Sequence, residues 1–76
     1  MNSTYKNLKL IIAHNNAQYE SGEITKEEYK RFKEEYLGYM DTFLMRKRIS
    51  NANYDELFDM FITFEDEENT ETEATA

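Results

Sequence analysis

The chain has 76 residues, no cysteine and a formal net charge of −7. This length allows one small domain, and the lack of cysteine excludes disulfide bonds and cysteine-ligated metal sites. The two glycines, Gly22 and Gly38, stand alone, so the clustered glycines of a phosphate-binding loop are absent. The acidic balance argues against direct binding to nucleic acid. Short apolar runs predict no membrane span, and the absence of a signal peptide favours a cytoplasmic location.

The charge is divided unevenly along the chain. Residues 1–48 hold seven acidic and all nine basic residues, whereas residues 49–76 hold nine acidic residues and no basic one. Six of those acids fall in residues 65–76, a stretch without a large apolar side chain. Such a segment cannot bury enough surface to offset the entropy of ordering it. The sequence therefore predicts a folded domain over residues 1–64 and a disordered acidic tail over 65–76.

A first helix is predicted over about residues 4–21, because apolar side chains recur there at spacings of three and four. Tyr5, Leu8 and Ile12 fall on one face of this helix. Gly22 follows at the position where a left-handed residue commonly ends a helix.

A second helix is predicted over about residues 26–46. Thr25 and Glu28 have the spacing of a capping box, in which each side chain accepts a hydrogen bond from the other residue's backbone. Ile24 and Tyr29 flank this cap at the positions of a hydrophobic staple. Large apolar side chains then follow the helical period at Tyr29, Phe32, Tyr36, Met40 and Phe43.

A third helix is predicted over about residues 51–64, and its start repeats the start of the second. Ser50 is the expected cap, with Ile49 and Tyr54 as the staple pair. The two helix starts superpose at an offset of 25 residues. Short connections then favour neighbouring helices that fold back on one another, which predicts an all-α, three-helix bundle.

The repeated unit resembles a motif of small phage and prophage proteins. Residues 19–29 read Tyr-Glu-Ser-Gly-Glu-Ile-Thr-Lys-Glu-Glu-Tyr, which is similar to the G-x-I-T-x-x-x-Y unit of SHOCT-like and XkdX-like proteins. Residues 44–57 resemble the same unit, with Lys47 where the glycine usually stands. The resemblance covers roughly residues 19–58. It implies a small helical interaction module and carries no catalytic residues.

Residues that could support chemistry are few. His14 is the only histidine and has no evident partner in the sequence. The adjacent carboxylates at 27–28, 34–35 and 55–56 diverge by about 100° on a helix, so they do not converge on a substrate. We predict no catalytic, cofactor-binding or metal site, and no enzyme activity. The basic cluster at residues 46–48 lies at the C-terminal end of the second helix, where positive charges interact favourably with the helix dipole. A contact of this cluster with a phosphate group or a nucleic acid is the alternative.

The second half of the second helix is apolar around most of its circumference, more than a helix in a small bundle needs. The residues predicted to contact a partner there are Leu37, Tyr39, Met40, Leu44 and Met45. Our hypothesis is a phage or mobile-element protein that binds another protein, from host or phage, or copies of itself as a homo-oligomer.

An alternative hypothesis is a nucleic-acid mimic that inhibits a host nuclease, defence protein or DNA-binding protein. Its acidic surface would consist of Asp55, Glu56, Asp59, Glu65, Asp66, Glu67 and Glu68. Residues 1–64 carry ten acidic and nine basic residues. The folded part is therefore close to neutral, whereas a mimic is expected to hold its negative charges on rigid elements.

Overall fold

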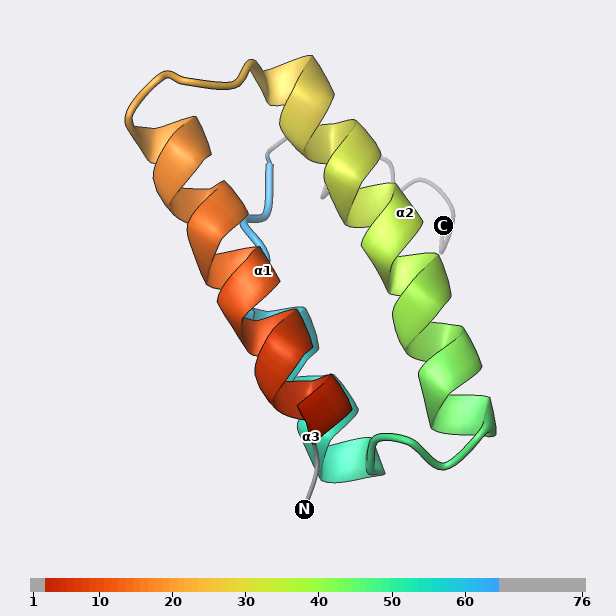
Figure 1. Ribbon diagram of the computed structural model, residues 1–76. Helices are drawn as coiled ribbons and strands as arrows, with labels where there is room; N and C mark the ends of the chain where they lie inside the picture. The colour runs from red at the N-terminus through yellow and green to blue at the C-terminus, as the bar shows by residue number, and fades with distance from the viewer. Residues whose placement is uncertain (1–2, 65–76) are drawn as a thin grey trace.

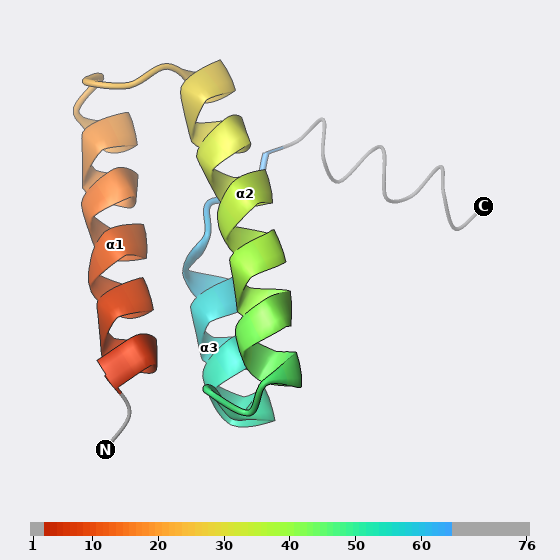
Figure 2. The ribbon, with the colours of Figure 1, turned by 45° about the vertical axis from the view of Figure 1, so that its right-hand side comes forward.

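A computed structural model describes residues 3–64 and contains three helices: α1 (Ser3–Glu20), α2 (Lys26–Met45) and α3 (Asn51–Met60). The predicted all-α fold is confirmed. Helices α1 and α2 lie side by side and antiparallel, and α3 packs behind them (Figure 1). The view in Figure 2 brings α3 into sight between the other two helices. The predicted tail over 65–76 lies outside the described residues.

The two turns between the helices have the same backbone structure, which extends the predicted repeat. Gly22 has a φ of 83° and Lys47 a φ of 59°, so both are left-handed. The residue after each donates its N–H to a carbonyl five residues earlier: Glu23 to Gln18 and Arg48 to Phe43, both at 2.8 Å. These bonds are the Schellman motif that ends many helices. All of these positions correspond at an offset of 25.

The helix starts repeat in the same way. The Thr25 Oγ1 accepts from the Glu28 N–H at 3.1 Å, and Glu28 accepts from the Thr25 N–H at 2.8 Å. The predicted serine cap also forms a full capping box, because Asn53 closes it: Ser50 Oγ accepts from Asn53 N–H at 3.0 Å and Asn53 Oδ1 accepts from Ser50 N–H at 3.3 Å. An asparagine side chain therefore replaces the glutamate of the first box.

The prediction that the third helix continues to residue 64 is wrong, because α3 ends at Met60 and Phe61 is extended (φ −67°, ψ 142°). Side chains of the other helices satisfy the backbone beyond this point. Asn16 donates its Nδ2–H to the Met60 carbonyl at 2.8 Å, and the Tyr29 hydroxyl accepts from the Ile62 N–H at 3.1 Å. The Lys33 ammonium donates to the Ile62 carbonyl at 3.1 Å.

The extended segment after α3 places its aromatic side chains in the core. Phe64 packs edge-on against Tyr19 and Tyr29, with ring centroids 5.5 and 5.8 Å apart. Phe61 lies 5.9 Å from Phe32. The buried core comprises Leu8, Ile12, Tyr29, Met40, Ile49, Leu57, Phe61 and Phe64. The chain after α3 thus fills the end of the molecule where α1 and α2 are joined.

Candidate protein-binding surface

An open groove runs between α1 and α2. It has a volume of about 260 Å³ and is lined by Thr4, Asn7, Leu8, Ile11, Tyr36, Tyr39 and Phe43. None of these residues carries a charge, and most of the lining is apolar. Leu8 forms the buried floor, Ile11, Tyr36 and Phe43 are half-buried, and the Tyr39 side chain is 46% exposed. We call this feature the α1–α2 groove.

The groove lies on the side of α1 and α2 that faces away from α3. Tyr5 and Lys9 of α1 bind Glu56 of α3, and Asn16 of α1 binds the Met60 carbonyl at the end of α3. Thr4 and Ile11 point to another side of the helix, because successive residues of an α-helix differ in direction by about 100°. No residue of α3 lines the groove. The third helix therefore covers one face of the α1–α2 pair and leaves the opposite face partly open.

Of the five residues predicted to contact a partner, only Tyr39 lines this groove. The prediction for Met40 is wrong, because its side chain is 0% exposed and belongs to the core. Met40 lies on the side of α2 that faces the interior of the bundle, four residues after the half-buried Tyr36. Sequence spacing alone did not separate this buried side of α2 from the open one.

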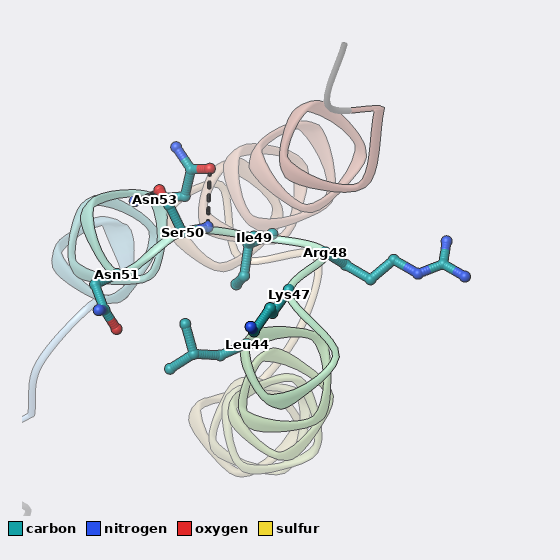
Figure 3. Close-up of a pocket in the computed structure, with 7 residues that line it drawn as sticks. All are labelled: Leu44, Lys47, Arg48, Ile49, Ser50, Asn51 and Asn53. Atoms are coloured by element: carbon teal, nitrogen blue, oxygen red, sulfur yellow. Dashed lines mark hydrogen bonds between the residues drawn. The ribbon is translucent and has the colours of Figure 1, made fainter.

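The other three predicted residues lie on separate surfaces. Leu37 is half-buried and borders a shallow pocket with Lys30, Lys33 and Glu34. Leu44 lines a hollow at the turn between α2 and α3, where Arg48 points away from the helices (Figure 3). Met45 is 83% exposed. The predicted partner-binding face is thus divided among several directions around α2.

Sequence reasoning missed the part of the groove that α1 contributes. Ile11 is not among the residues predicted for the apolar face of the first helix, and Thr4 and Asn7 are polar. Tyr36 and Phe43 follow the predicted helical period of α2, and in the structure both are half-buried, pack against the core and line the groove. These residues could be found only from the way α1 pairs with α2 on the side that α3 does not cover. This pairing is a tertiary contact, and the local sequence pattern does not encode it.

Among the acidic residues proposed for a mimic, Asp55 and Asp59 are exposed on α3 without an ion pair to another described residue. Glu56 differs, because it binds α1: the Tyr5 hydroxyl donates to its Oε2 at 2.7 Å and the Lys9 ammonium lies 3.0 Å from the same atom. The acidic residues at 65–68 lie outside the described part of the chain.

This contact changes the titration of both charged groups. The hydrogen bond from Tyr5, followed by that from Lys9, lowers the pKa of Glu56 below its ordinary value. The hydrogen bond to Glu56 is the main cause of the raised pKa of Lys9. Separately, the hydrogen bond from the Tyr54 hydroxyl to Asp41 (2.8 Å) raises the pKa of Tyr54. These contacts link α1 to α3 and α2 to α3, and none of them lines the α1–α2 groove.

His14 is exposed on α1. Within residues 3–64, no group of three or more histidine, cysteine, aspartate or glutamate side chains is placed to hold a metal ion. None of the three described helices combines the length and the apolar character that a membrane span requires.

No protein-family model matches the sequence, and neither a characterised protein nor a solved structure shows significant similarity to it.

Proposed function

We propose that this protein is a non-catalytic protein–protein interaction module that binds its partner in the α1–α2 groove. The observation that supports this proposal is the uncharged groove itself, with Tyr39 exposed at its edge and Ile11, Tyr36 and Phe43 half-buried along it. Aromatic side chains in a water-excluding depression are typical of the residues that dominate binding energy at protein interfaces. The resemblance to phage and prophage modules supports a role for this protein in a phage or mobile element.

The chemistry of the groove indicates the kind of partner. A groove lined by apolar and aromatic side chains with few polar groups favours an apolar face, such as one side of an amphipathic helix. A charged partner surface would lose its hydration there without gaining an ion pair. We therefore expect binding that depends on salt concentration less strongly than the binding of a nucleic-acid mimic would.

A photo-crosslinking amino acid at position 39 tests the proposal, with the same group at position 10 as the matched control. Leu10 is also an exposed apolar residue of a helix, at 69% exposure, and it does not line the groove. We expect a discrete crosslinked product from position 39 and none from position 10. Equal products from the two positions, or none from either, would contradict binding in the groove.

A chain shortened to residues 1–64 separates the proposal from nucleic-acid mimicry. This truncation removes six acidic residues and leaves the groove intact. If the groove binds the partner, crosslinking from position 39 persists in the shortened chain and at high salt. Loss of binding on truncation, together with strong salt dependence in the full chain, would favour mimicry.

A further inference from the structure

The side of α2 that borders the groove carries a regular stripe of residues. Spacings of four and three alternate along Glu28, Phe32, Glu35, Tyr39, Thr42 and Arg46. Residues with this spacing lie along one side of an α-helix, the side by which one helix can contact another along its length. Tyr39 lies near the middle of the stripe and also lines the groove.

The charges of the stripe are separated by sign. The acidic residues Glu28 and Glu35 come first, and the basic Arg46 caps the C-terminal end of α2. Glu35 and Arg46 are exposed, and neither forms an ion pair with another described residue. Eleven residues of α-helix separate them by about 16 Å along the axis, so they cannot pair within one chain.

The other wall of the groove is uncharged. On α1 it is formed by Thr4, Asn7, Leu8 and Ile11, and Asn15 follows on the same side of the helix. A partner that complements the stripe on α2 needs an apolar centre, a basic residue opposite Glu35 and an acidic residue opposite Arg46. A second copy of this chain meets these needs when it is related to the first by a two-fold rotation, because its own Arg46 then lies opposite Glu35 and its own Glu35 lies opposite Arg46.

We infer that the α1–α2 groove binds a second copy of this chain, with the two α2 helices antiparallel about a two-fold axis. This inference rests on the proposed function and names the partner. Glu35 of each copy then faces Arg46 of the other. The axis passes between positions 40 and 41, halfway between these two residues and close to Tyr39. Such an interface is isologous, so each surface residue contributes twice.

The test measures the molar mass of the full chain by sedimentation equilibrium over a range of concentrations. We expect a monomer–dimer equilibrium. Glu35→Arg and Arg46→Glu should each raise the dimer dissociation constant by about tenfold or more, because each creates two like-charge contacts. The double variant, which keeps the net charge of the wild type, should return the constant to within about threefold of the wild-type value. Circular dichroism checks that all variants keep the same helix content.

Apolar contact is tested in the same experiment. Tyr39→Asp should abolish the dimer, whereas Leu10→Asp adds the same charge on the outer side of α1 and should leave the dissociation constant unchanged. Failure of the double variant to restore the dimer would overturn the antiparallel pairing. A chain that stays monomeric up to about 1 mM would overturn self-association altogether.

The failure of this inference and that of the proposed function are distinguishable. A monomeric chain that still gives a crosslink to another protein from position 39, and none from position 10, overturns the second copy as partner and leaves the proposed function standing. A dimer that is insensitive to both Tyr39→Asp and the charge reversals overturns the groove as the interface.

Discussion

Lys47 has a left-handed backbone at the position where the first turn of the repeat has Gly22. A side chain with a Cβ in this conformation costs about 1 kcal/mol relative to glycine. We therefore expect Lys47→Gly to raise the free energy of unfolding by about 1 kcal/mol, measured by urea denaturation. The reciprocal change Gly22→Lys should lower it by a similar amount, although no heavy atom would lie within 4 Å of an added Cβ. If Lys47→Gly is destabilising, the lysine side chain contributes more than its backbone costs.

Tyr29 is fully buried, and its hydroxyl joins three elements. It donates to Asn16 Oδ1 on α1 and accepts from the Ile62 N–H after α3. Tyr29→Phe leaves both partners without their hydrogen bond in a partly buried site, which we expect to cost about 1–3 kcal/mol of unfolding free energy. Hydrogen exchange at the Ile62 amide should accelerate at the same time.

Tyr36→Phe is the matched control for this prediction. It removes a tyrosine hydroxyl from the same helix, and no hydrogen bond of that hydroxyl is seen within residues 3–64. Urea denaturation of the two variants should therefore differ by about 1 kcal/mol or more. Equal stabilities would mean that the Tyr29 hydroxyl is not a structural link between α1, α2 and the segment after α3.

At the scale of the helices, Glu56 couples α3 to α1 through Tyr5 and Lys9. Because the pKa of Glu56 is lowered in the folded state, this contact stabilises the fold above the ordinary pKa of 4.5. The contribution is lost as the pH falls through the lowered value. We expect the melting temperature of Glu56→Gln to fall less between neutral and acid pH than that of the wild type. Asp59→Asn removes one acid from the same helix without touching Tyr5 or Lys9, and it should leave that fall nearly unchanged.

The three helices and the starts of α2 and α3 could be predicted because their causes are local. The boxes at Thr25 and Ser50, and the turn at Gly22, depend on residues within five positions of one another. The end of α3 depends on Asn16 and Tyr29, which lie 44 and 33 residues from their backbone partners. Phe61 and Phe64 are three residues apart, so their spacing suits a helix as well as the observed extended segment. Local patterns therefore gave the wrong end for this helix.

The candidate site was predicted only in part for a related reason. The apolar circumference of α2 predicts more apolar surface than one core needs, and Tyr39, one of the predicted residues, lines the open groove. The side of α2 that α3 and the segment after it cover follows from contacts such as Tyr54 to Asp41 and Lys33 to the Ile62 carbonyl. These contacts connect distant positions, so the sequence alone could not show which side of α2 stays open.

At the scale of the whole molecule, the fold depends on the four residues after α3. Phe61 and Phe64 are buried, and loss of a buried phenylalanine side chain typically costs about 3–5 kcal/mol. A domain of this size is only marginally stable. We expect a chain ending at residue 60 to lose cooperative thermal unfolding, as followed by circular dichroism. A chain ending at residue 64 keeps all of the described core, so it should unfold within about 1 kcal/mol of the full chain. If the chain ending at residue 60 were as stable as the one ending at 64, α1, α2 and α3 would suffice for the core, and the segment after α3 would be only an accessory to it.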